Sequence, residues 1–167
     1  ALLNDSLIDA IYIGTPHNSH FDLSLKTLRC GKHLLCEKPM TMNSTEAMIL
    51  LNEARKTNLF FMEAFMYRCH PLTHKMLEMV KQEFSSQEVL IESSFGFTAD
   101  VDEKHRLKNP ELGGGSILDI GCYPLSMARL IAGSLVGNSF ADPLKISASG
   151  ELSSNNIDLN AKAELEF

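Results

Sequence analysis

The sequence predicts an α/β chain in which a parallel sheet comes first, followed by an α+β region whose strands suit antiparallel pairing. Strand-like and helix-like segments alternate up to about residue 65, which is typical of parallel strands joined by crossover helices. This pattern changes near residues 66–70. Beyond that point, strand-like segments alternate apolar and polar side chains, as expected where one face of a sheet is covered.

The first region is predicted to run strand, helix, strand, helix, strand. Its opening strand is a short apolar run that ends at Gly14. Gly31 stands where a glycine often ends a helix. Asn43 and Glu46 have the spacing of a capping box that begins the next helix. In order, these elements cover residues 8–14, 21–30, 33–36, 43–57 and 59–65.

The second region begins with a predicted helix and continues with segments that suit antiparallel pairing. Val89, Ile91 and Phe95 alternate with polar side chains, which favours a strand over 89–97. We expect Gly113-Gly114-Gly115 to open a helix that reaches about Ala132. The other predicted elements are a helix over 71–82 and two strands near 144–152 and 157–167. We therefore divide the chain into residues 1–67 and residues 68–167.

Composition excludes several classes of function. The formal net charge is −6 and no Lys/Arg cluster occurs, so we expect no nucleic-acid partner. No apolar run approaches the roughly 18–20 residues that cross a bilayer, so we expect no membrane span. The four cysteines form no C-x-x-C pair, which favours free thiols and a cytoplasmic protein. Without tight Cys and His spacing we expect no metal site.

Three polar clusters are the candidate functional groups. Thr15-Pro16-His17, with His20, follows the first predicted strand, and Glu37-Lys38-Pro39 follows the second. Ligands of open α/β sheets bind outside the carboxyl ends of the strands, so these two clusters should share a crevice. In the third cluster, Asp119 and Tyr123 lie four residues apart, on one helix face. Taken singly, Lys38 also suits a solvated loop and Tyr123 a core position.

Together these clusters carry a family resemblance. The order T-P-x-x-x-H, E-K-P and G-G-G-x-x-x-D-x-x-x-Y resembles the glucose–fructose oxidoreductase and inositol dehydrogenase family, often called Gfo/Idh/MocA. The resemblance covers nearly all of the chain. Inositol-type members have histidine where this chain has Tyr123, so the sequence is more similar to the glucose–fructose oxidoreductase, dihydrodiol dehydrogenase and xylose dehydrogenase branch.

The resemblance implies a fold and an activity. Residues 1–67 would be the C-terminal half of a dinucleotide-binding Rossmann domain. Residues 68–167 would be the first part of an α+β substrate and dimerisation domain with a large, open, mostly antiparallel sheet. The implied reaction transfers a hydride between NAD or NADP and a secondary alcohol or carbonyl of a sugar, polyol or cyclic diol. The resemblance also implies a homodimer. The implied substrate is a small sugar or diol.

The resemblance also implies residue roles. The residues expected to bind the cofactor are Thr15, Pro16, His17, His20, Glu37, Lys38 and Pro39. Lys38, Asp119 and Tyr123 are the expected catalytic residues. A phenol pKa of about 10 is high for a base, so Lys38 would either lower the pKa of Tyr123 or move the proton itself. Asp119 would hold Lys38 in place.

Two alternatives remain beside this interpretation. Arg68, His70 and Arg106 are candidates to bind substrate hydroxyls, although surface or interdomain ion pairs suit them as well.

The chain contains no G-x-G-x-x-G, which the family carries on an earlier strand. The chain could therefore be a fragment, and an inactive partial product, or a regulator that senses NAD(P) without turnover, is the alternative function.

Overall fold

The computed structural model describes residues 2–84 and 87–167. The chain forms two compact units. The first unit runs to Ala64 and includes residues 103–114, and the second comprises residues 65–102 and 115–167. Residues 103–114, which the sequence analysis assigned to the second domain, thus pack with the first unit. Among the described residues, no helix is both long and apolar enough to cross a bilayer.

The first unit confirms the predicted alternation of strands and helices. Its three strands are parallel and pair in the order β1-β2-β3, with Ile13 opposite Cys36 and Cys36 opposite Glu63. The elements are β1 (Ala10–Ile13), α1 (His20–Arg29), β2 (His33–Glu37), α2 (Ser44–Thr57) and β3 (Phe61–Ala64).

Local signals in the sequence set the ends of the two helices. The side chain of Asn43 accepts a hydrogen bond from Glu46 N at 3.0 Å, which caps the start of α2 as predicted. Asn58, with φ of 53°, ends α2 in the left-handed conformation, and Gly31, with φ of 74°, follows α1. Both helices therefore begin and end close to the predicted residues.

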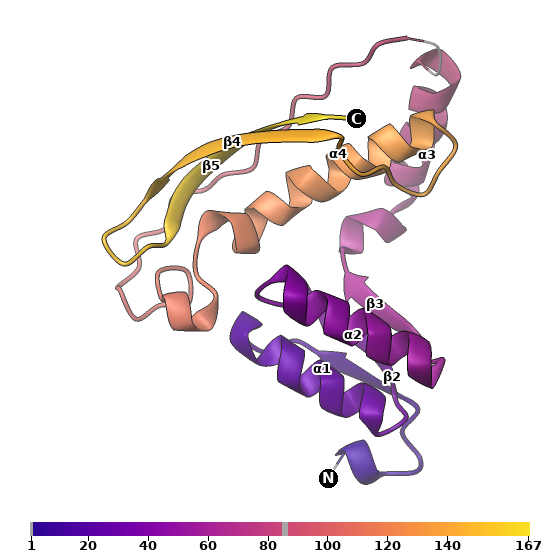
Figure 1. Cartoon of the computed structure of the whole chain (residues 1–167), viewed down its shortest axis with the longest axis vertical. Coiled ribbons are helices and arrows are strands. Elements are labelled where there is room, and N and C mark those ends of the chain that lie inside the picture. The colour runs from indigo at the N-terminus through magenta and orange to yellow at the C-terminus, as the bar shows by residue number, and fades with distance from the viewer. Residues whose placement is uncertain (1, 85–86) are drawn as a thin grey trace. The chain divides into compact units, whose positions relative to one another are not determined.

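The core of the first unit lies between one face of the sheet and both helices. Alternate residues of β2 point toward α1 and α2, which cover the same face (Figure 1). The opposite face carries Tyr12 and Phe60, each 60% exposed. The buried members of this core are Ile13, Leu28, Leu34, Cys36, Leu50 and Ala54.

The second unit combines helices with a two-stranded antiparallel sheet, so its predicted antiparallel pairing is confirmed. Opposite pairs such as Ile146 with Leu165 and Ala148 with Ala163 place apolar side chains on one face of this hairpin. Most of these side chains are exposed. The elements are α3 (Pro71–Phe84), α4 (Cys122–Leu135), β4 (Lys145–Leu152) and β5 (Asp158–Glu166).

The strand predicted over 89–97 is not formed, so that prediction is wrong. Residues 87–102 have no regular secondary structure. Alternating side chains indicate which face of a strand would be buried, but a strand also needs a neighbour for its backbone N–H and C=O groups. In the described part of the chain, β4 and β5 pair with each other and not with this segment.

The glycine-rich stretch does not open a continuous helix as predicted. Gly113 and Gly115 have φ of 76° and 110°, values that a right-handed helix does not contain. The helical path begins later, as a π-helical turn over Ile117–Gly121 that leads directly into α4. Gly114 and Gly115 also fall on the two sides of the division between the units.

Candidate functional site

The carboxyl ends of β1 and β2 bring the first two polar clusters together, as predicted. Thr15 and Pro16 are exposed in the loop after β1, and Lys38 is half-buried in the turn after β2. The two strands are parallel neighbours, so both loops leave the same edge of the sheet. This edge is therefore the candidate site of the first unit.

The buried side chain of His20 bonds to the loop after β1 and to the turn after β2. Its side chain has no exposed surface. Ring atom Nδ1 lies 2.7 Å from the carbonyl oxygen of Pro39, and Nε2 lies 2.8 Å from the carbonyl oxygen of Thr15. The family resemblance implied that His20 lines the cofactor. In the structure, its side chain is fully buried and bonds to the two loop carbonyls.

His17 fastens the returning segment 103–114 to the same edge. Its Nδ1 lies 3.1 Å from the carbonyl oxygen of Gly113, so Nδ1 is the donor. Burial lowers the pKa of His17 below its ordinary value, and the bond to Gly113 opposes this effect. The positive charges of Lys38, His20 and Arg106 add to the lowering. His17 is therefore favoured as a neutral ring.

Two carboxylates hold the backbone of the turn around Lys38. Glu37 Oε2 accepts a hydrogen bond from Lys38 N at 3.3 Å, and Glu63 Oε1 accepts one from Met40 N at 2.8 Å. Tyr12 Oη donates to Glu37 Oε1 at 2.8 Å, and this bond raises the pKa of Tyr12. Sequence reasoning missed Tyr12 and Glu63.

A signal for Tyr12 was present in the strand pattern. Tyr12 stands opposite Leu35 in the sheet, and Glu37 lies two residues beyond Leu35, on the same face. The two polar side chains were therefore predictable neighbours once the strand register was known. Glu63 had no such signal, because its contact is to the backbone of Met40.

In the second unit, Tyr123 lies in an aromatic cluster. Its ring is edge-on to Phe65, with centroids 5.6 Å apart, and it also packs against Tyr67 and Phe95. The hydroxyl group is 3.6 Å from the sulfur of Met66, a weak acceptor. The ring is thus firmly placed, while its hydroxyl has a contact that a better acceptor could replace.

Asp119 lies in the π-helical turn that precedes α4. The residue is only 7% exposed, so its carboxyl group lies largely inside the second unit. Its backbone N donates to Gly115 O at 3.3 Å. Lys38 belongs to the first unit, whereas Asp119 and Tyr123 belong to the second. The pairing of Lys38 with Asp119 therefore stays a prediction.

The three residues predicted to bind substrate have different surroundings. Arg68 donates to Ser126 through Nε at 3.2 Å and through Nη2 to the Ser126 carbonyl at 3.3 Å. His70 Nδ1 accepts from Leu72 N at 3.1 Å at the start of α3. Arg106 is exposed in the segment that returns to the first unit. The roles of Arg68 and His70 within their own unit are thus structural contacts.

Asp158 is a further residue that sequence reasoning missed. Its carboxylate accepts hydrogen bonds from Ser116 Oγ at 2.7 Å and from Ile117 N at 2.6 Å, so it caps the helical path that carries Asp119 and Tyr123. A side chain at position 115 would collide with this carboxylate. Gly115 is therefore needed to let Asp158 approach.

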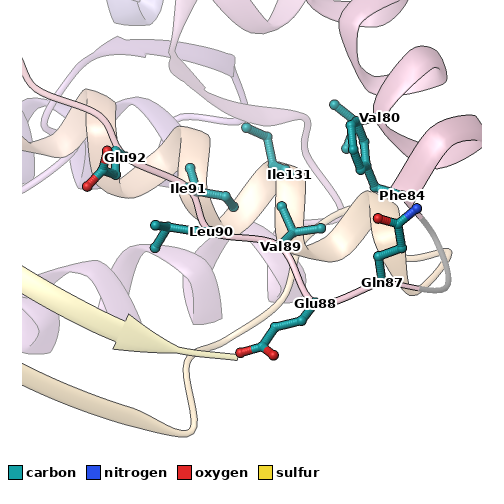
Figure 2. A pocket seen from close by; sticks show the side chains of 9 residues that line it. All are labelled: Val80, Phe84, Gln87, Glu88, Val89, Leu90, Ile91, Glu92 and Ile131. Carbon is teal, nitrogen blue, oxygen red and sulfur yellow. The ribbon is translucent and has the colours of Figure 1, made fainter.

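An apolar hollow of about 440 Å³ lies elsewhere in the second unit, beside the C-terminal end of α3. Figure 2 shows Val80, Val89 and Ile131 gathered in it, with the carboxylate of Glu88 pointing away. None of the predicted site residues lines this hollow. It is therefore separate from the candidate site.

The arrangement allows particular chemistry in each unit. The first unit presents an exposed loop and an ammonium group at the edge of a parallel sheet, which suits a polar cofactor or substrate. The second presents a phenol whose position is fixed by packing, which suits transfer of a proton.

Comparisons with known proteins show which oxidoreductases the chain is similar to. Residues 1–65 match the model of an oxidoreductase family with an NAD-binding Rossmann fold. The chain is 39% identical over 134 residues to D-xylose 1-dehydrogenase (NADP(+)) 2 of Haloferax volcanii, covering 80% of this chain and 41% of that protein. It is 33% identical over 166 residues to trans-1,2-dihydrobenzene-1,2-diol dehydrogenase of Xenopus tropicalis, covering 99% and 48%. The chain spans about half the length of the curated relatives it matches.

Solved structures give the same picture. An NAD-binding protein from Listeria innocua is 27% identical and superposes with a TM-score of 0.72, covering 98% of this chain and 46% of that one. The 3-ketoreductase KijD10 from Actinomadura kijaniata, in complex with NADP and TDP-benzene, is 27% identical, with a TM-score of 0.71. That match covers 97% of this chain and 48% of the ketoreductase.

Proposed function

The chain belongs to the Gfo/Idh/MocA family of oxidoreductases, and on that premise we propose that it carries part of an NAD- or NADP-dependent dehydrogenase active site. The reaction transfers a hydride between the nicotinamide and a secondary alcohol or carbonyl of a sugar, polyol or cyclic diol. The observation that carries the proposal is the joining of the Thr15 and Pro39 loops at one edge of a parallel sheet.

The proposal divides the work between the two regions of the chain. Residues 1–67 are the C-terminal half of the dinucleotide-binding domain, and residues 68–167 begin the substrate domain. Exposed Thr15 and Pro16, with Glu37 and Lys38 beside them, offer groups that suit the ribose and carboxamide of the nicotinamide end. No G-x-G-x-x-G occurs in the chain, so the pyrophosphate is assigned to none of these residues.

Proton transfer is assigned to Tyr123, with Lys38 as the alternative acceptor. A bound nicotinamide would supply the acceptor or donor of the hydride. The alcohol O–H bond would break as the carbonyl forms, and its proton would pass to Tyr123 as the phenolate, which becomes the phenol; in the reverse direction the phenol returns the proton. The packing of the ring against Phe65, Tyr67 and Phe95 supports this role, because a phenol held in one orientation can meet a substrate hydroxyl in a defined geometry. Asp119 orients Lys38 in this proposal, and Arg68, His70 and Arg106 are the proposed contacts with substrate hydroxyls.

The relatives support the class of reaction. The xylose and dihydrodiol dehydrogenases confirm the predicted branch of the family, and the xylose enzyme is NADP(+)-dependent. Variants of the ketoreductase KijD10 with a lysine replaced or a tyrosine replaced were studied in complex with NADP and TDP-benzene. These findings favour NADP as the first cofactor to test and a sugar or a cyclic diol as the first substrate.

The proposal also includes the assembly and the location of the protein. The apolar face of the β4–β5 hairpin, where Ile146 is 61% exposed, supports a homodimer in which this face is covered by a second copy. Sedimentation equilibrium tests this directly, since a mass of one chain at all concentrations contradicts it. Four cysteines without a C-x-x-C pair support a cytoplasmic location.

The first experiment compares cofactor binding with turnover. Residues 1–167, and any longer product of the same reading frame, are titrated with NADP and NAD and then assayed with D-xylose and trans-1,2-dihydrobenzene-1,2-diol. Binding followed by a change in nicotinamide absorbance supports the dehydrogenase. Binding without turnover on any sugar or diol favours a sensor, and the absence of both in every product contradicts the proposal.

A second experiment tests the assignment of the proton acceptor. In an active product, Tyr123→Phe should lower kcat by roughly two to four orders of magnitude, because the group that takes the proton is lost. Tyr67→Phe is the matched control, because it removes a hydroxyl from the same aromatic cluster, and that hydroxyl donates to Ser126 Oγ. A loss of less than about threefold for Tyr123→Phe would assign the proton to another group.

A further inference from the structure

Both ring nitrogens of the buried His20 face backbone carbonyl groups. The ring begins α1 and lies between two loops, with Nδ1 2.7 Å from Pro39 O and Nε2 2.8 Å from Thr15 O. Both distances are those of short hydrogen bonds. Both partners are backbone carbonyl groups, which accept hydrogen bonds and cannot donate them.

Two carbonyl acceptors need two N–H donors, one from each nitrogen of the imidazole. A neutral ring has one N–H, so its other nitrogen would direct a lone pair at a carbonyl oxygen. Inside the protein, without water, that contact leaves two acceptors unsatisfied. A ring that carries a proton on each nitrogen satisfies both carbonyls with charge-assisted bonds.

The charges around this ring suit a cation. On one side is the ring of His17, whose centroid is 5.8 Å away and whose pKa is lowered, chiefly by burial, so it is favoured as neutral. Two carboxylates bond to the backbone of the turn that His20 holds: Glu37, at the end of β2, bonds to Lys38 N, and Glu63 of β3 bonds to Met40 N. The positive groups that act on His17 are Lys38, Arg106 and His20 itself. Two carboxylates thus stand beside the turn with the two cations Lys38 and Arg106.

We propose that His20 is a positioning residue, protonated on both ring nitrogens, that ties the Thr15 and Pro39 carbonyls together and thereby sets Lys38 against the Thr15-Pro16 loop. Lys38 directly precedes Pro39, and its own N–H is held by Glu37. The backbone of Lys38 is thus fixed from both sides. The kinetic part of this inference rests on the proposed function, whereas the protonation of His20 does not.

Nitrogen-15 NMR of the full 167-residue chain tests the protonation without any assay of activity. Long-range correlations from the ring protons report whether each histidine nitrogen carries a proton. At neutral pH we expect both nitrogens of His20 to resonate as N–H nitrogens. His33 is the internal reference, because its Nδ1 accepts from Phe60 N at 3.0 Å and must appear as an unprotonated nitrogen. A His20 nitrogen that resembles Nδ1 of His33 overturns the inference.

Kinetics of an active product test the positioning role. His20→Gln leaves donors on one nitrogen only, so it cannot bridge both carbonyls. We expect kcat to fall by roughly tenfold to a hundredfold from displacement of Lys38, with the KM for cofactor changed by no more than about threefold. Thr27→Val is the matched control, since Thr27 is almost as deeply buried on α1 and its hydroxyl donates to Leu23 O within the same helix.

The outcomes separate the two claims. Equal effects of His20→Gln and Thr27→Val on kcat, in an active parent, overturn the positioning role and leave the proposed function intact. If both nitrogens of His20 carry protons but no product of the reading frame shows dehydrogenase activity, the protonation of His20 is supported and the proposed function is contradicted. A fall in kcat for His20→Gln alone, with both nitrogens protonated in the parent, supports both.

Discussion

The two units hold their chemical groups by different means. In the first, the buried ring of His20 and the half-buried carboxylate of Glu63 bond to the backbone of two loops, beside a compact core. In the second, Tyr123 is held by aromatic rings, and the neighbouring hairpin is largely exposed. Polar side chains thus fix loop backbones in the first unit, whereas ring packing fixes a side chain in the second. We expect the two units to differ also in the contacts that stabilise them.

The largest expected effect on stability comes from the core of the first unit. Leu50 has no exposed surface, so Leu50→Ala should lower the free energy of unfolding by about 2–5 kcal/mol, through lost burial and the cavity left behind. Ile49→Ala, at a neighbouring site that is 42% exposed, is the control and should cost much less. Chemical denaturation measures both.

Hydrogen exchange shows whether this loss stays in one unit. We expect faster exchange in β1, β2 and β3 of Leu50→Ala and unchanged exchange in β4 and β5. If amides of β4 and β5 lose the same protection, the two units unfold as one cooperative block. That result would break the comparison between them.

The contrast between the units also explains what the sequence could predict. Local signals such as Gly31 and the Asn43 cap act over a few residues, so the helices and strands of the first unit were predictable. The segment 89–97 has the alternation of a strand, but alternation does not specify a partner, and none of the described strands pairs with it. A propensity without a neighbour was therefore not enough.

Candidate site residues divide in the same way. The clusters at Thr15 and Lys38 were predictable because parallel strands end at a common edge. The contact of Asp158 with Ser116 was not, because it joins residues far apart in sequence and depends on the path that Gly115 allows. His20 was predicted at the right place but for a different contact, since a sequence does not reveal which backbone carbonyls a ring will meet.

An intermediate effect is expected in the second unit. Gly115→Ala should cost about 1–3 kcal/mol, because φ of 110° is strained for alanine and its Cβ would collide with the Asp158 carboxylate. Gly31→Ala is the matched control: φ is also positive, at 74°, but no heavy atom lies within 4 Å of the added carbon. Thermal unfolding compares the two variants. An equal loss in both would mean that the approach of Asp158 adds nothing to stability.

The smallest effect is expected at the start of α2, just after the turn that carries Lys38. Asn43→Ala removes the acceptor for Glu46 N and should lower the free energy of unfolding by about 1 kcal/mol. Asn43→Ser keeps an oxygen acceptor at that position, so its stability should stay close to the parent. Urea denaturation at equal protein concentration measures the difference. Glu46 Oε2 also accepts from Met42 N at 3.1 Å, so loss of the cap should loosen this turn as well as the helix. Faster amide exchange at Met42 in Asn43→Ala, and not in Asn43→Ser, would show that the first unit positions its loops through helix caps as well as through buried histidine. Equal exchange in the two variants would restrict that task to the contacts of His20, Glu37 and Glu63.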